Sequence, residues 1–266
     1  MIWVYAFLGL LVGALLNHAA NVLPRRQALG QPPRCRTCEA DLPPRQWFSI
    51  AALASGRRCA QCQEPLPWRG LILEIITALL FAFLWRAYGP SWPLALFTLF
   101  TVIFELVFVI DLEHRLILNV VIYPAIVFAA AASFFRPDLG YRLALLGGAL
   151  GFVLVLLIYL AGPLFVRLWS RMRGETTTEV PFGFGDVKLA LYIGLVVGFP
   201  AVVFALIIGM LLAGLGAALF IVARRSLGRR YVALTAIPYG PFLVAGGLLM
   251  LYYGAPIMSA YLGAYQ

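Results

Sequence analysis

The sequence predicts an all-α, polytopic integral membrane bundle of about eight transmembrane helices. Of its 266 residues, 63% are hydrophobic and only 12% are charged, and the mean hydropathy is +0.93. A soluble domain is normally about half apolar and a quarter charged. Apolar runs recur along nearly the whole chain, and the basic residues gather in alternate loops between them. Together these features exclude an ordinary soluble protein.

Each apolar run predicts one helix. The runs cover residues 2–16, 71–85, 92–110, 116–135, 143–165, 187–199, 201–222 and 237–253. Some are shorter than the roughly 20 residues that a straight span needs. The region 187–222 is the least certain, because it can be read as one long helix or as two short ones.

Charge distribution resolves that region. Of the 20 Lys and Arg residues, only Arg86, Arg136 and Arg142 fall on one set of alternating loops, and the other 17 fall on the opposite set. The positive-inside rule assigns the larger set to the cytoplasm. Since the loops before and after residues 187–222 are both basic, an even number of crossings lies between them, with a turn at Gly198-Phe199-Pro200. We therefore expect eight spans and both termini outside.

The chain divides at residues 17–70, the only stretch long enough to form a separate polar module. We expect a first transmembrane helix at 1–16, a cytoplasmic loop module at 17–70 and the main transmembrane domain at 71–266. A cleavable signal peptide is an alternative for the first run, but a basic start and a clear small-residue cleavage site are lacking. The net charge of +9 follows loop sidedness, so it indicates topology and anionic membrane lipids as partners, and no nucleic acid.

All four cysteines lie in the loop module, as two Cys-x-x-Cys pairs about twenty residues apart: Cys35, Cys38, Cys59 and Cys62. This spacing is typical of four thiolates around one tetrahedral zinc ion. Flanking arginines favour the thiolate form, and a cytoplasmic location disfavours disulfides. A redox pair and unligated thiols are the alternatives. The expected zinc is structural, because so short and polar a loop cannot bury a core of its own.

Two acids stand at the ends of apolar runs. Asp186 follows Gly183 and Gly185 at the mouth of run 187–199, and Asp111 ends run 92–110. Taken singly, Asp111 could pair with Arg115 and Asp186 could cap the helix that follows. Taken together, they have the layout of an intramembrane aspartic protease, in which two carboxylates share one proton and activate a water. The glycines would let an extended substrate backbone approach closely.

Several stretches resemble the prepilin peptidases, or type IV leader peptidases. They are 183–188 with Glu179, the Ile-Pro-Tyr-Gly-Pro-Phe segment at 237–242, the segment 110–119, the opening helix at 9–21 and the paired cysteines. The resemblance covers nearly the full length. It implies a bacterial inner-membrane enzyme that removes the basic leader of a prepilin or pseudopilin at the cytoplasmic face. Many family members then methylate the new N terminus with S-adenosylmethionine.

Carried over to this sequence, the resemblance makes Asp111 and Asp186 the catalytic acids and the four cysteines zinc ligands. Further candidates for substrate binding or support of the dyad are Gly183, Gly185, Lys188, Glu105, Glu113 and Glu179. Glu74 is expected to be structural or to serve methylation, and His18 and His114 are expected not to bind metal. The polar run 175–179 is a candidate gate over the site.

Residues 46–53, Gln-Trp-Phe-Ser-Ile-Ala-Ala-Leu, depart from the stretch common between the cysteine pairs of the family. This departure makes methylation less certain than proteolysis. A transporter with intramembrane acids and a non-catalytic zinc-bearing scaffold for pili or secretion are the alternatives from other classes. A transporter of this kind would show paired broken helices in two repeated halves, and a scaffold would not need the aspartates. Intramembrane proteolysis of a broader substrate set is a third alternative.

Overall fold

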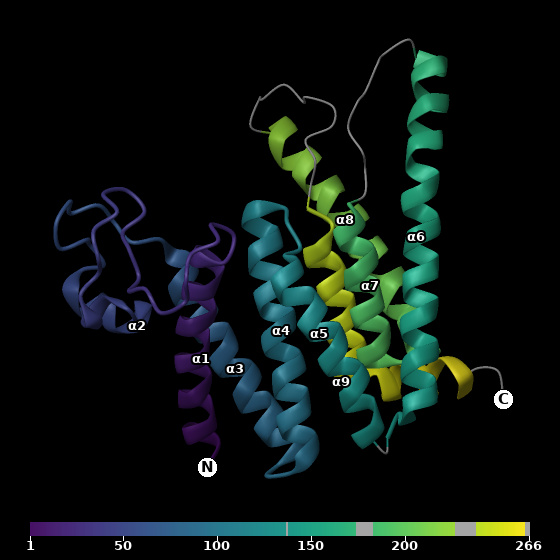
Figure 1. The fold of residues 1–266 in the computed structure, drawn as a ribbon, viewed down its shortest axis with the longest axis horizontal. Coiled ribbons are helices and arrows are strands. Elements are labelled where there is room, and N and C mark those ends of the chain that lie inside the picture. The colour runs from purple at the N-terminus through teal and green to yellow at the C-terminus, as the bar shows by residue number, and fades with distance from the viewer. Residues whose placement is uncertain (137, 174–182, 227–237, 264–266) are drawn as a thin grey trace. The chain divides into compact units, whose positions relative to one another are not determined.

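The computed structural model describes residues 1–136, 138–173, 183–226 and 238–263. In those residues every regular element is helical (Figure 1). The chain divides into two compact units, Met1–Leu106 and Val107–Gln266. Each unit is built from apolar helices that pack along their glycine-bearing faces.

The first unit contains α1 (Ile2–Val22), α3 (Trp68–Tyr88) and the larger part of α4 (Trp92–His114). α1 and α3 lie side by side (Figure 1). Gly9 and Gly13, one helical turn apart on α1, allow this approach. A Cβ atom at Gly9 would lie 2.7 Å from the Cα of Ala78, and one at Gly13 would lie 2.7 Å from the Cα of Glu74. Small residues at this spacing are the usual means by which membrane helices approach closely.

The loop module lies between α1 and α3. Its regular elements are short: the 3₁₀ turn η1 (Pro44–Gln46), the single-turn helix α2 (Ser49–Ala52) and the 3₁₀ turn η2 (Leu53–Ser55). Elements this short have little apolar surface to bury, so other interactions must hold the module together.

The second unit contains α5 (Asn119–Ala132) with the 3₁₀ turn η3 (Ser133–Phe135), α6 (Gly140–Arg173), α7 (Phe184–Val197), α8 (Ala201–Ser226) and α9 (Gly240–Gly263). α7 contacts α5, α6, α8 and α9, and 11 of its 14 residues are buried. Glycines again set the closest approach: a Cβ atom at Gly194 of α7 would overlap the carbonyl of Gly147 on α6. The chain therefore buries one short helix among four others.

All eight predicted helices are present, and their boundaries differ from the apolar runs. Six described helices are long and apolar enough to cross a membrane, whereas α5 and α7 have 14 residues each. Region 187–222 forms two helices, as charge predicts, with Gly198 (φ +73°) at the turn. α4 continues through Asp111 to His114, and α5 begins at Asn119 instead of 116. Arg115, at φ +54°, ends α4 because a left-handed residue cannot continue a right-handed helix.

The three-part division at residues 17 and 71 stays a prediction. The candidate gate at 175–179, with Glu179, lies outside the described residues.

Candidate active site and metal centre

Asp111 lies in the last turn of α4 and is almost wholly buried, with 5% of its surface exposed. Its carboxylate accepts a hydrogen bond from the backbone N–H of Gly240, the first residue of α9. A Cβ atom at position 240 would overlap the Asp111 Oδ2 atom. The expected alternative partner, Arg115, acts on Asp111 through its charge, and no ion pair joins the two in the described chain. The α9 backbone, brought close by a glycine, is therefore the partner of this acid.

Asp186 lies in the first turn of α7, where Gly183 is the N-cap residue. The Asp186 Oδ2 atom accepts a hydrogen bond of 3.1 Å from the Gly183 backbone N–H. The reading of Asp186 as the N-cap itself is therefore wrong: it occupies the third helical position and its side chain reaches back to the cap. An acid in this turn also complements the positive end of the helix dipole.

The two aspartates come together although 75 residues separate them in sequence. The Asp111 charge acts directly on the Asp186 carboxyl group. Two like charges near one another cost free energy when both acids are ionised. The C-terminal turn of α4 and the first turn of α7 thus carry two acids whose charges interact, which the sequence alone could only suggest.

Residues 239 and 240 lie near the two acids, and the sequence analysis assigned them no role. Gly240 contacts Asp111, whereas Tyr239 lies close enough to Asp186 for their charges to interact. Burial, and secondly the Asp186 carboxylate, raises the pKa of Tyr239 to about 12. Tyr239 therefore stays a neutral phenol at physiological pH. The sequence did offer a clue to these two residues, because they lie in the Ile-Pro-Tyr-Gly-Pro-Phe segment that resembles the prepilin peptidases. No side chain in that segment has an obvious catalytic role.

Lys188, two residues after Asp186, is buried and points toward α5. Its ammonium group donates a hydrogen bond to the Asn119 Oδ1 atom and lies 5.2 Å from the ring centre of Tyr123 and 5.5 Å from that of Phe184. Below it, Ile117 packs on Gly185, where an added Cβ would approach the Ile117 Cβ to 3.0 Å. The loop after α4, through Ile117, and the start of α5, through Asn119, therefore both contact the N-terminal part of α7.

The other end of α7 is held by Arg136. Its buried guanidinium donates to the Val196 carbonyl at 2.5 Å and to the Asp138 carboxylate at 2.6 Å. A cation at a helix C-terminus satisfies carbonyls that have no partner within the helix and stabilises the dipole. α7 is thus anchored at both ends, and the position of Asp186 is fixed with it.

The other acids predicted to serve the site have different surroundings. Glu105 is buried on α4 beside Thr77 of α3, whose hydroxyl donates to the Leu73 carbonyl at 2.8 Å. Six residues of helix turn the chain by roughly 600°, so Glu105 and Asp111 leave α4 on different faces. The Glu113 carboxylate lies 3.8 Å from the His114 Nε2 atom. Their roles at the dyad stay predictions.

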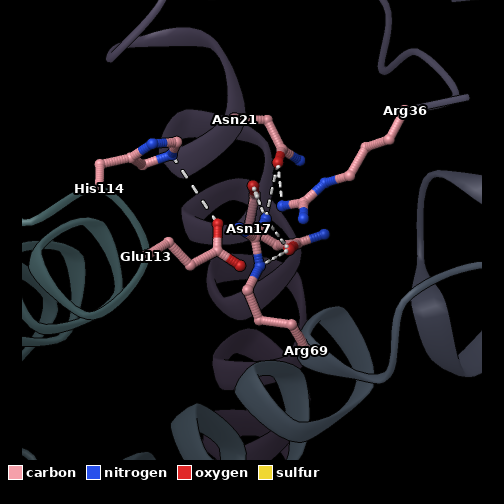
Figure 2. A network of polar contacts seen from close by, with 6 residues as sticks. All are labelled: Asn17, Asn21, Arg36, Arg69, Glu113 and His114. Atoms are coloured by element: carbon pink, nitrogen blue, oxygen red, sulfur yellow. Dashed lines mark hydrogen bonds and ion pairs between the residues drawn. The ribbon is translucent and has the colours of Figure 1, made fainter. Parts of the chain in front are cut away.

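Amide side chains of α1 hold two arginines in the first unit (Figure 2). The Asn21 Oδ1 atom accepts from Arg36 at 2.8 Å and from Arg69 at 2.9 Å. Arg69 also donates to the Asn17 Oδ1 atom at 2.6 Å. Figure 2 also draws the Glu113–His114 contact. Since Arg36 lies between two cysteines and Arg69 at the start of α3, these bonds tie the module to α1.

The four cysteines converge on one point in the loop module. Their Sγ atoms all lie within 4.8 Å of one another. The Cys35–Cys62 and Cys38–Cys59 sulfur pairs are 3.7 Å and 3.8 Å apart, far longer than the roughly 2.05 Å of a disulfide bond. Backbone N–H groups of Cys62 and Gln61 lower the pKa of Cys59 to about 6, which favours the thiolate. The cluster could hold a metal ion.

The two cysteine pairs have the same backbone structure, repeated after 24 residues. The Cys35 N–H donates to the Ala40 carbonyl at 2.9 Å, and the Cys59 N–H donates to that of Glu64 at 2.9 Å. Glu39 and Gln63, equivalent in the two turns, both have positive φ, at 56° and 57°. The paired turns aim N–H groups at the sulfur atoms and present the four thiols from two sides.

Glu74 connects the module to α3. It is fully buried, and its carboxylate accepts hydrogen bonds from the backbone N–H groups of Ser49 at 2.5 Å and Ile50 at 2.8 Å. Nearby, the Gln46 Nε2 atom donates to the Arg58 carbonyl at 2.8 Å. The segment 46–53, which departs from the family pattern, therefore has a structural task. It joins the second cysteine turn, at Arg58, to α3 at Glu74.

Replacing Glu74 with Ala is expected to lower the free energy of unfolding by about 2–4 kcal/mol, since two backbone N–H groups lose a charged, fully buried acceptor. The measurement is thermal unfolding of the purified protein in detergent, together with limited proteolysis between α1 and α3. Glu64→Ala is the matched control, because Glu64 is an exposed acid of the same module. Equal stability of the two variants would show that the Glu74 contacts contribute nothing.

Comparison with known proteins supports the family resemblance found in the sequence. Residues 94–218 match the Type IV leader peptidase family, and residues 7–88 match the Bacterial Peptidase A24 N-terminal domain. No solved structure matches the chain. The prepilin leader peptidase/N-methyltransferase of Pseudomonas aeruginosa is 27% identical, over 96% of this chain and 91% of the relative. That of Bacillus subtilis is 26% identical, over 98% of both chains.

The two matched regions follow one another in the chain and together include the cysteine module, Asp111 and Asp186. The helical bundle, the buried pair of acids and the full-length relatives agree. The protein is a membrane protease of the bacterial inner membrane, and it belongs to the type IV leader peptidase family.

Proposed function

We propose that this protein removes the basic leader from prepilins or pseudopilins by an aspartic mechanism at the cytoplasmic face of the membrane. The observation that carries the proposal is the pair of buried acids, Asp111 and Asp186, close enough for their charges to interact. The relatives named prepilin leader peptidases supply the substrate class. The basic loops support a cytoplasmic active site with both termini outside.

In the proposed mechanism the dyad holds one proton between two carboxyl groups. One carboxylate removes a proton from water, and the other carboxylic acid donates a hydrogen bond to the scissile carbonyl. No covalent intermediate with the enzyme is needed. The Gly240 N–H and the Gly183 N–H each occupy one side of an acid, so they orient the carboxyl groups toward the space between them.

The other residues predicted to serve the site have different roles, according to their contacts. Gly183 and Gly185 give the backbone of α7 room for its cap and for Ile117. Glu113 and Glu179 carry the charge that a basic leader would bind. Glu105 supports the dyad only indirectly, since its polar neighbour is on α3.

Two accessory groups are part of the proposal. The cysteine cluster fits structural zinc: a tetrahedron with Zn–S bonds of about 2.3 Å places its sulfur atoms roughly 3.8 Å apart, and the measured pairs are 3.7 Å and 3.8 Å apart. The relatives' second name, N-methyltransferase, supports S-adenosylmethionine as the donor for methylation of the new N terminus. Zinc would take no direct part in peptide hydrolysis.

The direct test is cleavage of a purified prepilin by the purified protein in liposomes, with product masses read by mass spectrometry. The expected result is one cut that releases the basic leader and, when S-adenosylmethionine is present, a further product heavier by one methyl group. Cleavage without addition of the methyl group would support the peptidase activity and contradict the methyltransferase activity. No cleavage of any prepilin would contradict the proposed substrate class.

Lys188 is expected to position the dyad through Asn119. Lys188→Met should lower kcat by roughly 10²-fold, the cost of a misplacement of about 1 Å, with little change in KM and an unchanged pH profile. The exchange Lys188→Asn with Asn119→Lys should restore part of kcat, because it rebuilds the same hydrogen bond with donor and acceptor reversed.

Steady-state cleavage at several pH values is measured for the wild type and for both variants. A shift in the acidic side of the pH–rate profile, with kcat unchanged, would mean that Lys188 acts on the dyad through its charge. Equal losses in Lys188→Met and in the exchanged variant would mean that the hydrogen bond to Asn119 is not the relevant contact.

A further inference from the structure

A groove of about 340 Å³ lies between the C-terminal half of α1 and the loop module. Its walls are mainly hydrocarbon, supplied by Leu11, Leu15, Leu29, Trp47 and Phe48, with His18 among them. Leu11 and Leu15 belong to the membrane-spanning part of α1, and 38% and 59% of their surfaces are exposed. One side of the groove is therefore made by an exposed apolar face of a helix long enough to cross a membrane.

A polar pocket adjoins this groove and shares His18 and the segment 31–33 with it. Three arginines line the pocket, Arg25, Arg34 and Arg36, with Glu39 as the one acid. Arg34 is paired with Asp41 at 2.9 Å. The Arg25 side chain is exposed and makes no hydrogen bond or ion pair within the described residues. The apolar groove thus continues into a pocket with excess positive charge.

His18 stands at the boundary between the two cavities. Its Nε2–H donates to the Leu29 carbonyl at 3.0 Å, whereas its buried Nδ1 atom has no hydrogen-bond partner in the described structure. A buried ring nitrogen without a partner costs free energy unless a further group reaches it.

We propose that this composite cavity binds an anionic phospholipid of the cytoplasmic leaflet. An acyl chain lies in the groove along Leu11 and Leu15, and the phosphate lies at Arg25 and His18. The two halves of the cavity match the two halves of such a lipid, and basic pockets at a membrane surface are suited to anionic headgroups. A basic leader peptide is excluded as the occupant, since its charge has the same sign as the pocket. Because the groove is lined by both α1 and the loop module, the bound lipid joins the two.

The test measures lipid retention by the intact purified protein, using native mass spectrometry during titration with phosphatidylglycerol or phosphatidylcholine. Phosphatidylglycerol is expected to bind more tightly. Arg25→Asn should weaken its binding by roughly fivefold, the contribution of one arginine near an anionic membrane surface. Arg26→Asn is the matched control: it removes the same charge from an exposed neighbour that does not line the pocket, and it should leave binding unchanged.

A second pair of variants tests the acyl chain. Gly30 lines the groove, and an added Cβ atom there meets no atom within 4 Å, so Gly30→Leu fills the groove without a clash. It should weaken binding of both lipids. Gly214→Leu, at an equally open site on α8, should not.

Three results would overturn the proposal: equal affinity for the two lipids, equal effects of Arg25→Asn and Arg26→Asn, or equal effects of the two leucine variants. Competition by millimolar inorganic phosphate that displaces the lipid completely would show a free-anion site instead of a lipid site. None of these readouts depends on peptidase activity.

Discussion

Asp186→Asn is expected to reduce leader cleavage by at least roughly 10³-fold, and Asp111→Asn is expected to do the same. An amide can neither remove a proton from water nor share one with the opposite carboxylate, so each change removes the general acid–base function entirely. The double variant should be no slower than either single variant, since residues that act as a unit give non-additive losses. Product mass against time, over at least three decades of rate, is the measurement.

Two controls separate chemistry from folding in this experiment. Asp41→Asn removes a half-exposed carboxylate of the loop module, whose side chain is 59% exposed, and should cut at the wild-type rate. The cysteine cluster provides an internal reporter, because metal content should be unchanged in the dyad variants if the first unit stays folded. A variant that still cuts at the wild-type rate would refute the aspartic mechanism and return the scaffold and transporter readings to consideration.

The second large effect is expected at the metal centre. Cys59→Ser should reduce bound zinc from about one ion per chain to nearly none, and it should make the segment between α1 and α3 sensitive to protease. Structural zinc contributes on the order of 10 kcal/mol in small metal-folded modules, and here the module has only η1, α2 and η2 as regular structure. Elemental analysis, proteolysis and thermal unfolding measure the three consequences.

Thr37→Val is the matched control, because Thr37 lies between two cysteines of the same turn and bears no thiol. It should keep the metal. Brief chelation of the wild-type protein should reproduce the protease sensitivity before it lowers the cleavage rate per intact molecule, since the metal takes no part in hydrolysis. A wild-type mass that shows oxidised cysteine pairs, with no zinc, would instead support the redox alternative.

Much of the fold could be predicted because each membrane helix appears in the sequence as a run of apolar residues. Hydropathy located all eight helices, and the alternation of arginines separated α7 from α8, which hydropathy alone left joined. Helix ends were harder to place. The end of α4 depends on the backbone angle of Arg115, and a left-handed arginine leaves no pattern in the sequence.

At the site, the residues with distinctive chemistry were found and those with ordinary chemistry were missed. Asp111, Asp186 and the cysteines stand out because acids and thiols are rare in this chain. Tyr239 and Gly240 lie near the two acids because α9 begins beside them. Only tertiary packing determines where α9 begins relative to the acids. The 24-residue repeat of the cysteine turns was also hidden, because it exists in hydrogen bonds and backbone angles more than in side-chain identity.

The length of α7 has a consequence for how the enzyme meets its bilayer. A helix of 14 residues is about 21 Å long, whereas the hydrocarbon layer is about 30 Å thick. A lipid-exposed helix this short would have to thin the surrounding bilayer. Since α7 is enclosed by other helices, its length does not need to match the thickness of the bilayer. The longer helices of the bundle meet that requirement. The depth of the Asp186 carboxylate is therefore set by protein packing and not by membrane thickness.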